Sequence, residues 1–420
     1  MNKNRFVSLV FLLMMCMCLV SCGDDYSAVY FQNGSADFDY SGIGVDENTV
    51  FELGSCGKAV AAYTALALVD EGKLELNQKI KPYLDSNLIT DDPRLDEITL
   101  NQLLCHTAGF SPSYEFGVDK KIYSDPGKEF RYSGVGYIYL QNVIEKASGM
   151  SLEQAASHYV FEPLGMNNST FENVKTITPY MNAGNAVLYA LVVFVLAFVV
   201  LFLVSFIIGK VTKYKYFKFR TAYLVCFFAA GIINVIALLL IMTKVLVMFV
   251  ICFAIMGIAL LITRKKAKIF IACVPVIAVV ILILGFTLKV RIPVTNELVS
   301  KGPNCAYSLK STAKDMSLFC NELMKKQKSS ENVFAQMFTP AVKIDEKNSW
   351  GLGIAIEASS KSGTTYWHSG INPGAQSLFV LYPEQNKYVV ILTNNDDGLN
   401  FAKDKAHAFL NVDGEWDIKR

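Results

Sequence analysis

Ser55 and Lys58 are two side chains whose types and spacing could do chemistry. They follow Gly54, which permits a close backbone approach, and they open the apolar run 59–69. That run is apolar nearly all round a helix, which is typical of a helix in the middle of a domain. Three positions are roughly one helical turn, so the two side chains share a face. Burial lowers the pKa of an amine and a helix N-terminus favours negative charge, so a lysine there can take the proton of a serine hydroxyl. The pattern predicts a serine nucleophile that works without histidine.

The same spacing occurs again at Ser311 and Lys314, so chance can supply it. A serine that only caps a helix is the plain structural alternative for an isolated copy. The case for Ser55 therefore depends on the rest of the chain.

Strands and helices that would position Ser55 are predicted on both sides of it. Residues 26–44 form a hairpin pattern, because Asn33-Gly34 is a strong signal for a two-residue turn. Hydrophobic periodicity and turn residues predict the later elements. These are a short helix and turn at 98–109, a helix at 136–148, a capped helix start at 309–319, antiparallel strands at 364–370, 377–383 and 387–394, and a final helix at 399–410.

The N-terminal segment 1–22 has the pattern of an export signal. Lys3 and Arg5 precede an apolar run, and Leu19-Val20-Ser21-Cys22 resembles a bacterial lipobox. This predicts a signal peptide of the lipoprotein type that leaves Cys22 as a lipidated N-terminus. A short uncleaved anchor is the alternative.

Membrane segments are predicted from composition, since 52% of the residues are hydrophobic, only 18% are charged, and the mean hydropathy is +0.33. Within 184–290, four uncharged segments have the length of a spanning helix. Basic residues in their first and third connections place those loops in the cytoplasm. Residues 23–183 and 295–420 would then form two parts of one domain outside it, in a multi-pass protein of the cell membrane. The four segments are 186–208, 221–242, 245–263 and 269–288.

Charge and composition argue against several other classes. A net charge of +2 gives no reason to expect a nucleic-acid partner. The ten cysteines lack metal-type spacing, and the four histidines include no His-Glu-x-x-His, which argues against a zinc protease. A serine nucleophile of the predicted kind implies no cofactor.

Six blocks in order resemble the serine β-lactamase and penicillin-binding-protein superfamily, in its class C-like branch. The resemblance covers about 26–175 and 300–412. It implies an α+β fold, in which an antiparallel sheet flanked by helices joins a helical region, here interrupted by the four transmembrane helices. The blocks are Phe-Glu-Leu-Gly-Ser-Cys-Gly-Lys at 51–58, Leu-Leu-Cys-His-Thr-Ala-Gly at 103–109, Phe-Arg-Tyr-Ser-Gly at 130–134, Phe-Glu-Pro-Leu-Gly-Met at 161–166, Ser-Thr-Ala-Lys-Asp-Met at 311–316, and Trp-His-Ser-Gly at 367–370.

The resemblance implies catalytic roles for three residues. Ser55 would be the nucleophile and Lys58 its proton acceptor. Tyr132 matches the tyrosine of the family's Tyr-x-Asn motif and would move protons between the serine and the leaving group. Gly134 stands where that motif has asparagine, which removes an amide expected to contact substrate and argues against β-lactam hydrolysis.

A second part of the site is implied by the match of His368-Ser369-Gly370 to the family's Lys-Thr-Gly strand. The backbone N–H groups of Ser55 and Ile371 would form the oxyanion hole that stabilises a tetrahedral intermediate. His106 matches a position that is usually structural, so no chemical role is expected for it.

The function implied is an exported, membrane-anchored serine hydrolase that forms an acyl-enzyme on Ser55. Its substrates would be small esters, amides or peptides, with esterase or D-peptidase activity favoured over β-lactamase activity. A non-catalytic penicillin-binding-like sensor coupled to the membrane helices is the alternative. A transporter is a third interpretation, and the apolar character of the four segments weakens it.

Overall fold

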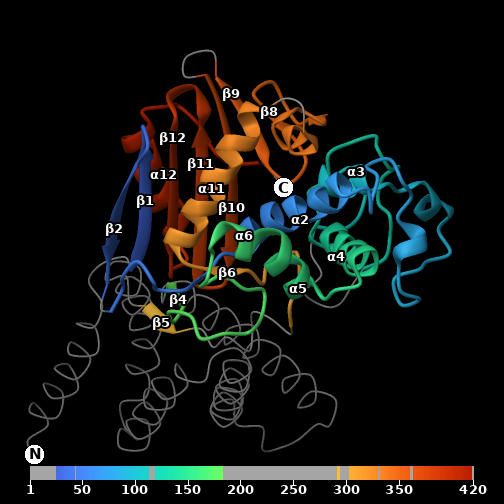
Figure 1. Ribbon diagram of the computed structural model, residues 1–420, viewed down its shortest axis with the longest axis horizontal. Coiled ribbons are helices and arrows are strands. Elements are labelled where there is room, and N and C mark those ends of the chain that lie inside the picture. The colour runs from blue at the N-terminus through green and yellow to red at the C-terminus, as the bar shows by residue number, and fades with distance from the viewer. Residues whose placement is uncertain are drawn as a thin grey trace, which may run out of the picture. The chain divides into compact units, whose positions relative to one another are not determined.

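The computed structural model describes residues 25–42, 44–112, 119–182, 291–293, 302–329, 332–359 and 363–418 (Figure 1). The chain divides into two compact units, Gly23–Pro179 with Val299–Arg420, and Met1–Cys22 with Tyr180–Leu298. In the second unit the described residues form one antiparallel pair, β4 (Tyr180–Asn182) with β5 (Arg291–Pro293). The first unit contains all the other described elements.

An eight-stranded antiparallel sheet forms one half of this unit (Figure 1). The strand order is β2-β1-β12-β11-β10-β9-β8-β7, so the N-terminal hairpin pairs with the last strand of the chain. The strands are β1 (Tyr26–Gln32), β2 (Ser35–Ser41), β7 (Val342–Lys343), β8 (Asn348–Trp350), β9 (Ala355–Ser359), β10 (Gly363–Asn372), β11 (Ala375–Tyr382) and β12 (Lys387–Thr393).

The predicted hairpin and the three predicted late strands are confirmed. Asn33 and Gly34 connect β1 to β2 with φ of 53° and 91°, the left-handed backbone that a two-residue hairpin turn of this type requires. Asn386, between β11 and β12, has φ of 51° and ends the short turn η7 (Pro383–Gln385). These turns fix the register of the strands that they join.

Two helices cover opposite faces of the sheet. The ring of Tyr30 contacts Phe409 of α12 (Gly398–Leu410), whereas Phe31 stacks on Tyr388, whose hydroxyl bonds to Ser317 of α11 (Ala313–Lys328). Adjacent residues of a strand point to opposite faces. The central strand β11 is therefore buried along its whole length.

The other half of the unit is helical and joins the sheet through α2 (Gly57–Asp70). Residues 57–68 of α2 are all buried, as their continuous apolar pattern predicts. In Figure 1, α2 lies between the sheet and helices α3 and α4. The other elements are η1 (Gly54–Cys56), β3 (Phe51–Glu52), β6 (Lys310–Ser311), α3 (Leu100–Leu104), α4 (Gly134–Ser148), α5 (Leu152–Ala156), α6 (Glu162–Leu164), the 3₁₀ turns η2 (Lys81–Tyr83), η3 (Pro93–Glu97) and η6 (Val333–Phe338), and the π-helical turn η4 (Ser157–Phe161).

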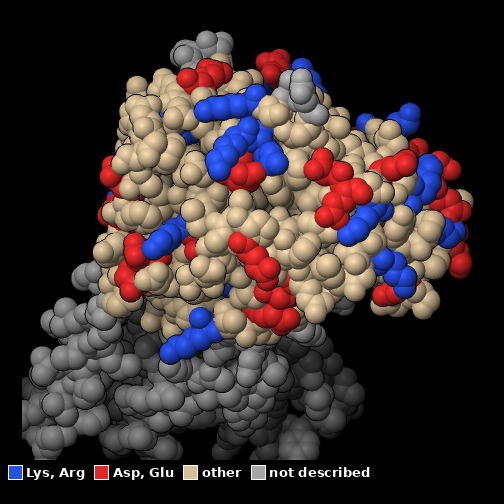
Figure 2. Space-filling view, viewed as in Figure 1, with Lys and Arg blue, Asp and Glu red and all other residues tan. Residues whose placement is uncertain are grey.

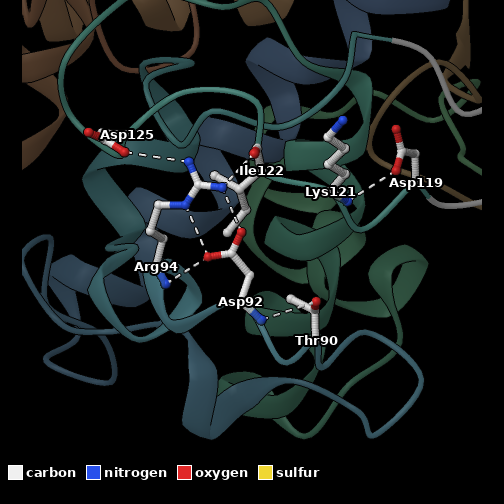
Figure 3. Close-up of polar contacts among 7 residues, drawn as sticks. All are labelled: Thr90, Asp92, Arg94, Asp119, Lys121, Ile122 and Asp125. Atoms are coloured by element: carbon white, nitrogen blue, oxygen red, sulfur yellow. Dashed lines mark hydrogen bonds and ion pairs between the residues drawn. The ribbon is translucent and has the colours of Figure 1, made fainter.

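Arg94 of η3 holds the segment that leads toward α4 (Figure 3). Its guanidinium donates to both carboxylate oxygens of Asp92 (3.0 and 2.6 Å) and to the carbonyl of Ile122 (2.8 Å). A longer contact of 3.4 Å reaches Asp125. Because a planar guanidinium offers several donors at fixed angles, Arg94 ties Ile122 and Asp125 to η3. Tyr132 follows this segment in the chain.

Charges of both signs are interspersed on the face drawn in Figure 2. Over the described part of that face, Lys and Arg side chains lie next to Asp and Glu, and neither sign forms a broad field. This arrangement offers no electrostatic track for a polyanion on that face.

The helices of the described residues are too short to span a bilayer. The longest, α11, has 16 residues. At 1.5 Å per residue its length is about 24 Å, against about 30 Å for a hydrocarbon core. No helix in the described ranges is both long and apolar enough to cross a membrane. This finding overturns the prediction of a fold interrupted by four transmembrane helices, and with it the multi-pass location in the cell membrane.

The physical reason for the correction is that hydropathy records a preference for apolar surroundings, which a protein core satisfies as a bilayer does. Helix α2 is apolar all round and yet lies in the core. The four predicted segments (186–208, 221–242, 245–263 and 269–288) and the predicted signal 1–22 with Cys22 lie outside the described residues.

Candidate active site

The side chains of Ser55 and Lys58 meet at the junction between the sheet and the helical region. Ser55 lies in the 3₁₀ turn η1, and α2 begins two residues later at Gly57, slightly after the predicted helix start. The amine of Lys58 donates to Ser55 Oγ at 2.9 Å. Ser55 is 8% exposed and Lys58 only 1%. The predicted pair is therefore hydrogen-bonded and shielded from water.

The amine of Lys58 has a second partner that the sequence did not indicate. It donates to the backbone carbonyl of Ala306 at 2.5 Å. The ring centroids of Tyr132 and Tyr137 lie 5.1 and 5.6 Å from Nζ. These contacts fix the amine on the side of Ser55 that faces α4.

Tyr132 is held in place by His106. The His106 carbonyl accepts from the N–H of Arg131 (2.8 Å), and His106 Nδ1 accepts from the N–H of Ser133 (3.1 Å). The two rings lie 4.4 Å apart. His106 has φ of 57°, which turns its side chain and its carbonyl toward the same segment. His106 therefore bonds to the backbone on both sides of Tyr132.

Gly134 begins α4, two residues after Tyr132. Ser133 caps this helix, since its hydroxyl accepts from the N–H of Gly136 (2.8 Å) and donates to the carbonyl of Ser111 (2.6 Å). The N–H of Gly134 donates to the carbonyl of Pro112 (2.9 Å). Gly134 thus lies close to Tyr132 in the chain, and as a glycine it brings no amide side chain to the site.

Strand β10 brings the other predicted residues beside η1. A Cβ placed on Gly370 would lie 1.8 Å from the carbonyl oxygen of Leu53, and one placed on Gly54 would lie 2.9 Å from the backbone nitrogen of Ile371. The backbone around the nucleophile therefore lies directly against the strand, in an approach that only glycine permits. Gly54 also has φ of 51°.

His368 and Ser369 precede this contact in β10. The ring of His368 is 2% exposed, and its Nδ1–H donates to the carbonyl of Ser369 at 2.8 Å. The ring centroid lies 6.4 Å from that of Tyr132 and 5.4 Å from that of Trp350. Ile371 is 47% exposed, so its side chain faces solvent at the point where the strand meets η1.

Several residues that hold this site together were missed from the sequence. Ser377 of β11 lies opposite Gly370, donates to the carbonyl of Leu53 (2.7 Å) and contacts Cys56 Sγ (3.1 Å). Cys56 in turn donates to the carbonyl of His368 (3.3 Å). Burial raises the pKa of the Cys56 thiol to about 12, so it acts as a packed, un-ionised neighbour of the serine. Strand alternation beside Gly370 is the signal that could have found Ser377.

The second Ser-x-x-Lys copy is not assembled in the same way. Ser311 lies in β6, where its hydroxyl bonds to Ser169 (2.7 Å). Lys314 donates instead to Glu47 (3.1 Å). The two copies share a spacing but not a geometry.

No group of His, Cys, Asp and Glu side chains suited to a metal ion occurs among the residues that the structure describes. The four cysteines seen there, Cys56, Cys105, Cys305 and Cys320, are buried and free.

The fold has the α+β architecture of β-lactamases and penicillin-binding proteins. It is similar to a penicillin-binding protein from Bacillus halodurans, with a TM-score of 0.59, 16% identity, and coverage of 91% of this chain and 94% of that one. It is also similar to a D-stereospecific amidohydrolase from Streptomyces sp., with a TM-score of 0.55, 15% identity, and coverage of 89% and 90%.

The family model named Beta-lactamase matches residues 20–184 and 290–412, and the chain belongs to this family. Among curated proteins, penicillin-binding protein 4 of Amycolatopsis lactamdurans is 26% identical over an alignment of 144 residues, and the match covers 31% of this chain and 38% of that protein. The match thus spans well under half the length of that relative.

Proposed function

We propose that this protein is a serine hydrolase that forms an acyl-enzyme on Ser55. One observation carries the proposal most directly, namely the 2.9 Å hydrogen bond from the buried amine of Lys58 to Ser55 Oγ. An ordinary serine hydroxyl is a weak nucleophile and needs an adjacent base. Lys58 would be that base with its amine neutral, so that the nitrogen lone pair takes the Ser55 proton.

The proposed reaction uses groups at fixed positions. Ser55 Oγ attacks a carbonyl carbon while its proton passes to the Lys58–Tyr132 pair. The backbone N–H groups of Ser55 and Ile371 stabilise the negative oxygen that develops. Tyr132 then gives a proton to the leaving group, and an acyl ester on Ser55 remains. Attack of water on that ester, with the proton again taken by the pair, restores the serine.

The proposed substrates are small amides, peptides or esters. The likeness to a D-stereospecific amidohydrolase supports amides and D-peptides. Gly134 supplies no side-chain amide to the substrate, which favours esterase or peptidase activity over β-lactam hydrolysis. His368, Ser369 and Gly370 would line the substrate along β10. The proposed reaction at Ser55 is predicted to need no cofactor.

Intact-protein mass after exposure to a fluorophosphonate tests the proposal. A single adduct is expected on the wild type and on Ser311→Ala, and none on Ser55→Ala. Ser311 is the matched control, because it has the same sequence spacing without a lysine at its hydroxyl. No adduct on folded wild type would refute the proposal.

Turnover is measured separately with p-nitrophenyl esters, D-peptides and a chromogenic β-lactam. Release of product beyond one equivalent is expected with the esters or D-peptides. Acylation without release on any of them would instead favour a penicillin-binding-like sensor.

A further inference from the structure

Asn372, the last residue of β10, makes one buried and one partly buried hydrogen bond, neither of which takes part in the proposed reaction. Its amide nitrogen donates to a carboxylate oxygen of Glu52 at 3.0 Å and to the backbone carbonyl of Tyr307 at 3.3 Å. Asn372 is 5% exposed and Glu52 is 3% exposed. A buried polar group that loses its hydrogen-bond partner destabilises the folded state, so these two bonds favour the observed position of the amide.

Each contact of Asn372 reaches a segment that carries part of the proposed chemistry. Glu52 lies in β3, three residues before Ser55. Tyr307 follows Ala306, whose carbonyl accepts from Lys58. Asn372 itself follows Ile371, the proposed oxyanion donor. One side-chain amide therefore joins the nucleophile, the base and the oxyanion strand.

The amide oxygen of Asn372 also lies against the nucleophile turn. A Cβ placed on Gly54 would lie 3.2 Å from Asn372 Oδ1. The amide oxygen thus lies near Gly54, the residue that precedes Ser55. A side-chain amide that hydrogen-bonds to two segments at once helps to fix the spacing between them.

The strand partner and the burial of Glu52 define the environment of its hydrogen bond to Asn372. It pairs across β3 and β6 with Lys310, whose amine donates to the carbonyl of Ser308 at 3.0 Å. Burial raises the pKa of the Glu52 carboxyl and lowers that of the Lys310 amine. Both side chains therefore sit in a dry environment, where a hydrogen bond to Asn372 is worth more than in water.

We propose that Asn372, with Glu52 as its acceptor, is a positioning residue that sets the distance from Ile371 N–H to Ser55 and from Ala306 to Lys58. This inference rests on the proposed acyl-enzyme chemistry at Ser55. Asn372 touches no reacting atom. Its loss is expected to slow acylation while leaving the affinity for the reagent nearly unchanged.

The experiment measures the rate constant and the half-saturating concentration for fluorophosphonate labelling of folded protein. Asn372→Leu keeps the branched shape of the side chain and removes both hydrogen bonds. We expect labelling about 30- to 100-fold slower, because a displacement near 1 Å can cost about 10²-fold in rate, with the half-saturating concentration within about threefold.

A double variant tests whether restoring the hydrogen bond between positions 52 and 372 also restores the labelling rate. In Asn372→Asp with Glu52→Gln, the pair still has one carboxyl and one amide, with donor and acceptor exchanged. The hydrogen bond between positions 52 and 372 can then form again. We expect labelling at least about tenfold faster than in Asn372→Leu.

Thr365→Val is the matched control in the same strand. It removes a buried hydrogen bond, the one from Trp416 Nε1 to Thr365 Oγ1 (3.1 Å), at a place remote in β10 from Ile371. Its melting temperature is expected to fall while its labelling rate stays within about twofold of the wild type.

The outcomes separate this inference from the proposed function. No labelling of wild type would refute the acyl-enzyme on Ser55 itself. Labelling of wild type and Asn372→Leu at equal rates would overturn the positioning role alone. So would a double variant no faster than Asn372→Leu, or a Thr365→Val variant slowed as much as Asn372→Leu.

Discussion

Gly370→Ala is expected to disable the site by steric displacement alone. The added Cβ would lie 1.8 Å from the carbonyl oxygen of Leu53 and 2.6 Å from Ser377 Oγ. The serine side chain can rotate, but the carbonyl belongs to the turn that carries Ser55. Real Cβ atoms essentially never come within 3.0 Å of a heavy atom outside their own residue and its two chain neighbours. The strand and the turn must therefore separate by about 1.2 Å, the difference between those two distances.

That displacement falls on the gap between Ser55 and Ile371, where the proposed oxyanion hole lies. A misplacement of about 1 Å can cost about 10²-fold in rate, which corresponds to about 2.7 kcal/mol in activation free energy. We therefore expect fluorophosphonate labelling of Gly370→Ala to be at least about 10²-fold slower than that of wild type. Overpacking should also lower the free energy of unfolding by about 1–3 kcal/mol.

The assay compares labelling rates on protein that is shown by circular dichroism to be folded. Gly398→Ala is the control, since its Cβ would lie 1.7 Å from Thr393 Oγ1, at the start of α12. It should lose stability and still label at close to the wild-type rate. A Gly370→Ala variant with wild-type labelling and wild-type melting temperature would refute the close approach of β10 to Leu53.

Three further outcomes follow from the buried groups near Ser55. Lys58→Met should fold and label at least about 10²-fold more slowly, because it removes the proposed base; a rate within about threefold of wild type would contradict that role. The Cys56 thiol, with its pKa raised by burial to about 12, should react with a disulfide reagent at pH 8 only in urea; rapid reaction of folded protein at this thiol would contradict its burial. Burial raises the pKa of Glu52 above 4.5, so the folded state binds its proton more tightly, and the stability that this gives is lost as pH rises through the raised pKa. Glu52→Gln should remove that loss, so its melting temperature relative to wild type should rise with pH above 4.5; a constant difference would contradict this sign.

Elements whose residues carry local signals could be predicted from the sequence. Asn33-Gly34 specifies its turn through backbone preference, and the continuous apolar run of α2 specifies a buried helix. Strands β7 and β8 could not be predicted, because they have two and three residues and owe their strand conformation to their neighbours in the sheet. The predicted transmembrane interruption failed because hydropathy does not distinguish one apolar environment from another.

The parts of the candidate site that depend on particular side chains could be predicted from the sequence. Ser55 and Lys58 are three positions apart, and one helical turn brings them together. Ala306 acts through a backbone carbonyl, which any residue possesses, so its sequence gives no signal. Asn372 contacts Glu52 across 320 positions of the chain, and only the folded structure joins them.

The pairing of β1 with β12 has a consequence for synthesis of the chain. Tyr26 lies opposite Thr393, and the nearby hydrogen bond from Asn394 to Asp25 spans 369 positions. At roughly 5–20 residues per second, a ribosome needs roughly 20–70 s to make the partner of the first strand. Until then the N-terminal hairpin presents an open edge on which other nascent chains can pair. The yield of native protein should therefore depend on elongation speed and on chaperones that bind nascent strands, independently of the stability that the finished fold attains.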